Sequence, residues 1–208
     1  MENVLEKKRK KEGIFTEKFI KNFREIFRPL SRALANSSIS PNSITFLSLF
    51  LGLACGVFLA LDYLWTGLIL GLMMGFCDII DGQMAKDYNG ATKFGGILDS
   101  TIDRFCEFFA YTGLGIRYYF QDRPVWVLLC AMVFLGSVMV SYVKARAEGE
   151  NLECKVGWLQ RPERLAITAT GVLFRGTGID IAVVFLAVFT QWTVIQRLIH
   201  IYKLTKQN

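Results

Sequence analysis

The sequence predicts an all-α integral membrane protein with six transmembrane helices, preceded by a cytoplasmic juxtamembrane amphipathic helix. Hydrophobic residues make up 52% of the 208 residues, and the mean hydropathy is +0.35, which exceeds the usual level of soluble domains. A membrane-spanning helix needs about 20 mostly apolar residues, and the apolar residues here gather in blocks. The blocks are 44–61, 64–77, 105–116, 125–143, 165–174 and 181–195. Several blocks are shorter than a span, so their polar flanks must enter the membrane too.

The distribution of Lys and Arg predicts the orientation. Of the 24 basic residues, all but Arg117, Arg123 and Arg175 fall on one side of the predicted helices. Because basic residues concentrate on the cytoplasmic side, we expect a multi-pass protein of the cell membrane with both termini in the cytoplasm. The net charge of +6 then favours anionic lipid headgroups as partners, and we expect no binding to nucleic acid.

The first 38 residues divide into two segments. Residues 1–13 are highly charged, which predicts a disordered basic tail and no cleavable signal peptide. Residues 14–38 place apolar side chains at helical spacing with Lys and Arg between them. This pattern predicts an amphipathic helix that lies in the cytoplasmic interface, and Pro29 should kink or split it.

Residues 39–208 are predicted to form a six-helix transmembrane catalytic domain. Ser40 is a candidate cap for the first helix, with Pro41 in its first turn, and a turn near Asp62 leads to the second. Turn-rich segments separate the remaining helices. The expected helices after the first run from about 64 to 86, 94 to 119, 124 to 148 and 161 to 174. A turn is expected at 175–180, and the last helix follows it to the C-terminus. The five cysteines lie mostly within apolar segments and are expected to be small core residues.

Four aspartates interrupt this apolar sequence. Asp78 and Asp81 share one face of the second helix, and Asp99 and Asp103 share one face of the third. A short link makes these helices antiparallel neighbours, so the two pairs can face each other near the cytoplasmic surface. Carboxylates within a membrane are costly and usually mark function. Because oxygen ligands favour hard divalent ions, we expect two cations, Mg²⁺ or Mn²⁺, at a site suited to phosphoryl chemistry.

The spacing of these residues follows a longer pattern, D-x2-D-G-x2-A-K-x8-G-x3-D-x3-D. It resembles the signature of the CDP-alcohol phosphotransferases, also called class I CDP-alcohol phosphatidyltransferases, in which Arg is usual at the position of Lys86. Lys keeps the charge but loses the fork geometry of Arg. The resemblance extends to six helices, a preceding amphipathic helix and the "PN..T" opening of the first helix.

The resemblance implies an enzyme that transfers a phosphatidyl group from a CDP-linked lipid such as CDP-diacylglycerol to an alcohol and releases CMP. It also implies the roles of individual residues. Asp78, Asp81, Asp99 and Asp103 would be metal ligands, and Asp103 the general base. The CDP site would be lined by Gly82, Ala85, Lys86, Pro41, Asn42 and Thr45. The family is often homodimeric, so a homodimer is a further expectation.

A second stretch, 141–165, concerns the acceptor. Lys144, Arg161 and Arg164 fall at the cytoplasmic ends of two helices, and a cavity with several fixed cations suits a phosphorylated acceptor. The stretch resembles a segment of the phosphatidylinositol-phosphate synthases, and so does the segment around Arg197. The resemblance implies inositol phosphate as the acceptor, with Lys144, Arg161 and Arg197 in contact with its phosphate. Arg164 is a further candidate acceptor-phosphate contact.

Other functions fit parts of the pattern. The same basic side chains would also bind the acceptor of a phosphatidylglycerol-phosphate synthase. Alternatively, these residues would only anchor the helices at the membrane surface, without binding any ligand. Buried acids also mark the path of a cation-coupled transporter. Release of CMP separates the enzyme from the transporter.

Overall fold

The computed structural model describes residues 17–37, 39–87, 91–154 and 156–206. These residues form seven α-helices and contain no strand. The helices are α2 (Glu17–Asn36), α3 (Pro41–Ala60), α4 (Leu64–Asp87), α5 (Lys93–Phe120), α6 (Pro124–Gly149), α7 (Arg161–Phe174) and α8 (Gly176–Thr205). The all-α class is therefore confirmed. The expected basic tail, residues 1–13, lies outside the described residues.

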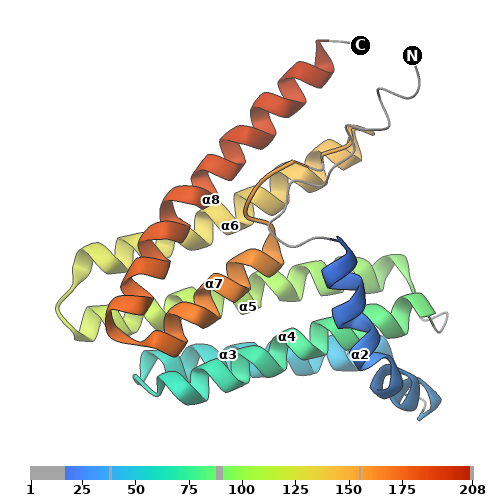
Figure 1. Ribbon diagram of the computed structural model, residues 1–208, viewed down its shortest axis with the longest axis horizontal. Helices are drawn as coiled ribbons and strands as arrows, with labels where there is room; N and C mark the ends of the chain where they lie inside the picture. Colours follow the sequence, from blue (N-terminus) through green and yellow to red (C-terminus); the bar gives the residue numbers. More distant parts are fainter. Residues whose placement is uncertain (1–16, 38, 88–90, 155, 207–208) are drawn as a thin grey trace.

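Local signals explain several of the helix ends. The side chain of Ser40 accepts a hydrogen bond from the backbone of Ser43, and Pro41 follows in the first turn of α3. Thr92 caps α5 in the same way, with Gly95 as the donor. Such caps satisfy backbone N–H groups that have no partner within the helix. The helix α2 runs through Pro29 as one element, and Figure 1 shows a change of direction along it.

Within the described residues, four helices are long and apolar enough to cross a membrane, namely α3, α4, α6 and α8. Large apolar side chains on their outer faces are exposed, for example Phe50, Leu128 and Ile181, as is expected where lipid replaces water. The other two helices of the bundle differ. The helix α5 carries several charged residues along its length, and α7 has only 14 residues, about 21 Å at the usual rise.

The packing of α3 against α4 and α5 positions the site. These two contacts are the most extensive between helices, while α6 packs on α5 and α8, and α7 on α4 and α8 (Figure 1). Gly56 of α3 and Gly113 of α5 lie backbone against backbone, because a Cβ on either residue would meet the main chain of the other helix. Small residues allow this close approach, which holds α5 directly beside α3.

Candidate active site

Three carboxylates converge between α4 and α5. Asp78 of α4 and Asp99 and Asp103 of α5 each offer an oxygen within 4.8 Å of the others. They converge because Asp99 and Asp103 are one helical turn apart and because α4 and α5 both pack against α3. All three are partly buried, so their charges repel each other more strongly than they would in water.

The fourth aspartate of the motif lies slightly apart from this group. Asp81 is 4% exposed and accepts a hydrogen bond of 2.7 Å from the hydroxyl of Thr45 on α3. The interaction connects the second turn of α3 to the helix α4, which carries the first half of the motif. In the structure Asp81 is therefore held by a side chain of α3, while the other three acids face one another.

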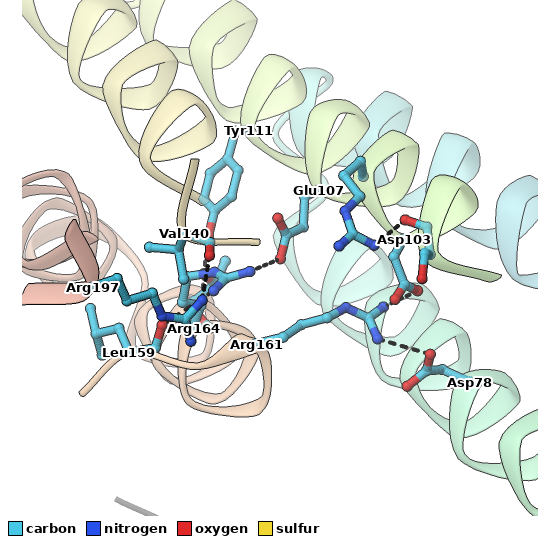
Figure 2. A network of polar contacts seen from close by, with 12 residues as sticks. Asp78, Asp103, Glu107, Tyr111, Val140, Leu159, Arg161, Arg164 and Arg197 are labelled. Carbon is cyan, nitrogen blue, oxygen red and sulfur yellow. Dashed lines mark hydrogen bonds and ion pairs between the residues drawn. The ribbon is translucent and has the colours of Figure 1, made fainter. Parts of the chain in front are cut away.

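The guanidinium of Arg161 lies between the carboxylates of Asp78 and Asp103 (Figure 2). Its Nη1 is 2.8 Å from an oxygen of Asp78, and its Nη2 forms an ion pair with Asp103. Arg161 is the first residue of α7, so its long side chain reaches from the end of that helix to α4 and α5. The positive charge of Arg161 thereby offsets part of the negative charge of the three acids, and the group keeps a net negative charge.

The structure separates the four cations expected at an acceptor site. Arg164 is 1% exposed and forms an ion pair of 2.7 Å with Glu107. Arg197 is 4% exposed and donates to the backbone carbonyls of Val140 and Val156. Lys144 lies on the surface, 3.7 Å from Glu148. Of the four, only Arg161 contacts the acids in the described part of the chain.

The residues expected at a CDP site lie around the meeting point of α3, α4 and α5. Asn42 is close to the start of α5, since a Cβ on Gly95 would lie 3.1 Å from its side-chain oxygen. On α4, Gly82 and Ala85 are half-buried and Lys86 is exposed in the last turn. A Cβ on Gly82 would have no atom within 4 Å, so the helix is thin there and open to a ligand. Pro41 begins α3 nearby.

The acid group fits a divalent cation on chemical grounds. Its donors are all carboxylate oxygens, which hard ions such as Mg²⁺ and Mn²⁺ prefer. Three acids beside two guanidinium groups, those of Arg161 and Arg104, also leave negative charge that a cation would neutralise. The group does not favour zinc, because it consists of aspartates alone and contains none of the cysteine or histidine ligands that are typical of zinc sites.

The sequence analysis did not identify two polar residues that lie next to the acids on α5. Glu107 and Tyr111 continue the four-residue spacing that begins at Asp99, and both are buried. Glu107 contacts Arg164, and the hydroxyl of Tyr111 lies 3.0 Å from that of Thr168. The repeat at 99, 103, 107 and 111 could have predicted these contacts. Polar residues buried on one face of an apolar helix need hydrogen-bond partners on a neighbouring helix.

Comparison with known proteins agrees with the motif. The family model for CDP-alcohol phosphatidyltransferase matches residues 38–200. A phosphatidylinositol phosphate synthase of Corynebacterium glutamicum is 36% identical over 84% of this chain and 83% of the relative. An archaetidylinositol phosphate synthase of Methanothermobacter thermautotrophicus is 33% identical over 91% of this chain and 97% of the relative.

Solved structures are similar over most of the chain. The crystal structure of Mycobacterium tuberculosis phosphatidylinositol phosphate synthase with CDP-DAG bound has a TM-score of 0.77 at 30% identity, covering 86% of this chain and 94% of that one. The same enzyme in complex with manganese and citrate has a TM-score of 0.76 at 30% identity, covering 84% and 88%. With its motif, its fold and its relatives in agreement, the chain belongs to the CDP-alcohol phosphatidyltransferase family.

Proposed function

We propose that this enzyme transfers the phosphatidyl group of CDP-diacylglycerol to inositol phosphate and releases CMP. The observation that carries the proposal is the convergence of Asp78, Asp99 and Asp103 within 4.8 Å, at the spacing of the family motif. Relatives named as phosphatidylinositol phosphate synthases support the acceptor. The relative solved with CDP-DAG bound supports the donor.

The acids would hold the divalent cation, and a relative solved in complex with manganese supports the binding of a divalent cation. Asp78, Asp99 and Asp103 are the proposed ligands from the converging group, and Asp81 the fourth from beside it. We propose two ions, Mg²⁺ or Mn²⁺. The bound cation supplies charge neutralisation for the diphosphate and for the oxygen that leaves with CMP.

The residues of the chain would orient the two substrates. Lys86 in the last turn of α4 and Asn42 beside the start of α5 would contact the CDP moiety, and Pro41, Thr45 and Ala85 would line the same site. Asp103 would accept the proton of the acceptor hydroxyl. The acceptor oxygen then forms a bond to the phosphorus of the phosphatidyl group, and the bond from that phosphorus to the oxygen of CMP breaks.

Arg161 is the proposed contact for the acceptor phosphate. It lies beside the acids and a guanidinium binds a phosphate through paired donors. Lys144 is a second candidate because it is exposed at the end of α6. Arg164 and Arg197 are both buried. Arg164 contacts Glu107, and Arg197 contacts backbone carbonyls. We therefore propose that these two residues hold neighbouring parts of the protein in place.

The proposed membrane arrangement has six crossings, α3 to α8. The acids and Arg161 would compensate one another inside the bundle, which makes a polar α5 and a short α7 tolerable. The excess of basic residues on one side supports cytoplasmic termini and an active site on that side. The exposure of Ile26 and Leu30 supports α2 as a helix in the interface. The expected homodimer is tested by light scattering of the purified protein in detergent.

The decisive experiment measures CMP release from purified protein with CDP-diacylglycerol and Mg²⁺. Inositol 1-phosphate, glycerol 3-phosphate, free inositol and serine are added one at a time. Release with inositol 1-phosphate alone is expected, and release with glycerol 3-phosphate alone would instead identify a phosphatidylglycerol-phosphate synthase. A parallel series with an ether-linked CDP lipid tests the donor, because one relative is an archaetidylinositol phosphate synthase.

A further inference from the structure

A polar stripe on α5 continues inward from the acids. Asp103, Glu107 and Tyr111 follow one another at intervals of four residues, which places them on one face of the helix. Glu107 is 5% exposed and Tyr111 is 4% exposed. Neither belongs to the group of three acids, so the stripe extends beyond the reacting centre.

The helix α7 meets this stripe residue by residue. Arg161 pairs with Asp103, Arg164 pairs with Glu107, and Thr168 lies 3.0 Å from the hydroxyl of Tyr111. The first two pairs lie next to each other in Figure 2. Long polar side chains thus bridge α5 and α7 at three successive levels.

Arg164 also holds the segment that leads into α7. Its Nη2 lies 2.7 Å from the carboxylate of Glu107, while its Nη1 donates to the carbonyl of Leu159 at 3.3 Å. Leu159 is 1% exposed and lies two residues before Arg161, where α7 begins. The guanidinium of Arg164 therefore connects α5 directly to the chain that carries Arg161.

The ion pair of Glu107 with Arg164 is better explained by the positions it fixes than by the stability it adds. Burying two opposite charges costs desolvation that their attraction does not reliably recover, and well-packed apolar replacements are often as stable. A planar guanidinium with two partners in different directions does, however, fix positions closely. In metal sites, groups behind the ligands commonly set their orientation.

We infer that Glu107 is a positioning residue, which acts through Arg164 to hold Arg161 against Asp78 and Asp103. Glu107 itself touches neither the acids nor Arg161 through any hydrogen bond or ion pair found in the described residues. The inference rests on the proposed function in so far as Arg161 binds the acceptor phosphate. It assigns Arg164 to the support of the site and not to the acceptor.

The test replaces the whole pair by apolar residues, in the double variant Glu107→Leu with Arg164→Met. This variant leaves no unpaired buried charge, so it is expected to unfold at about the temperature of the wild type. The KM for the phosphorylated acceptor should nevertheless rise about tenfold, a loss typical of removing a group behind a ligand. The KM for CDP-diacylglycerol should stay unchanged. An unchanged acceptor KM in the folded double variant overturns the inference, since the pair would then serve the fold alone.

Two further variants keep the test decisive. Glu107→Gln preserves the size of the side chain and one acceptor for Arg164 but leaves the buried charge of Arg164 unpaired. It should therefore unfold at a lower temperature than the wild type and show a smaller rise in the same KM. If the double variant does not fold, a wild-type KM in Glu107→Gln overturns the inference. Tyr111→Phe is the matched control. It removes the next contact between α5 and α7, in which the hydroxyl of Tyr111 lies 3.0 Å from that of Thr168. Both KM values should stay unchanged in this variant.

A second readout separates this inference from the proposed function. If the wild type releases no CMP with any phosphorylated polyol, the proposed function fails. Titration of Mn²⁺ into the acceptor-free protein then decides the role of Glu107, because Arg161 contacts two of the acids irrespective of the acceptor. Loss of the pair should release Arg161 and tighten Mn²⁺ binding in the double variant. Unchanged Mn²⁺ binding would refute the positioning role.

Discussion

The guanidinium of Arg161 lies 2.8 Å from the carboxylate of Asp78, although the two residues are 83 positions apart in the chain. The same guanidinium contacts Asp103, so it bridges two of the three acids that are proposed to bind a cation. An arginine and a metal ion that approach the same oxygens compete for them. Arg161 thus offsets the charge of the acids, and once a cation does so it would be free to contact the proposed acceptor phosphate.

Replacing Arg161 by Gln should tighten the binding of Mn²⁺ in the absence of acceptor. The variant removes a positive charge beside the acids, and a like charge within a few ångströms disfavours a bound cation. Isothermal titration of detergent-purified protein measures the change. The matched control is Arg146→Gln, which removes an exposed arginine that pairs with Glu150 at 2.7 Å. Equal Mn²⁺ affinity in both variants would contradict the competition.

Replacing Asp103 by Asn should abolish CMP release while the protein remains folded. The amide keeps the size of the side chain but can neither accept a proton nor bind a cation as a carboxylate does. Turnover with CDP-diacylglycerol and inositol 1-phosphate measures activity, and thermal unfolding in detergent measures the fold. Asp87→Asn, in the exposed last turn of α4, is the control. Full activity of the Asp103 variant would remove this residue from the role of base.

The sequence was sufficient to predict most helix positions and the convergence of three of the four acids, because both follow from local spacing. The turn expected at 175–180 was wrong in part, since α8 already begins at Gly176. The starts of α3, α6 and α7 lie at the predicted residues Pro41, Pro124 and Arg161, since proline and capping residues act within one turn. The convergence of Asp78 with Asp99 and Asp103 followed from two helical spacings and a short link.

The partners of the cations could not be predicted in the same way. The length of an arginine side chain allows several partners, and the choice between them depends on how α7 approaches α5. Arg161 reaches the acids, whereas Arg164, three residues later, is directed at Glu107. Helical spacing alone does not distinguish these two orientations, because the sequence does not fix the distance between the two helices.

Replacing Thr45 by Val should raise the KM for CDP-diacylglycerol. The hydroxyl of Thr45 donates to the buried carboxylate of Asp81 at 2.7 Å, and losing a partner of a buried charged group costs about 1–3 kcal/mol. Asp81 would then be free to turn away from its position beside the other acids. Steady-state kinetics with each substrate varied in turn measures the effect. Thr170→Val is the control, since that hydroxyl is exposed and donates to a carbonyl within α7; equal KM values in the two variants would contradict the role of Thr45.

Replacing Gly113 by Ala should destabilise the protein through the contact of α3 with α5. The added methyl group would meet the backbone of Gly56, and a main chain cannot move aside as a flexible side chain can. Overpacking of this kind typically costs about 1–3 kcal/mol, so the midpoint of thermal unfolding in detergent should fall. Gly75→Ala is the control, because a Cβ there has no atom within 4 Å and the residue lies on a helix of similar length. Since α5 carries Asp99 and Asp103, separation from α3 should also lower the rate of CMP release in the Gly113 variant. A Gly113 variant as stable and as active as the Gly75 variant would show that the two helices tolerate a wider spacing than their backbone contact indicates.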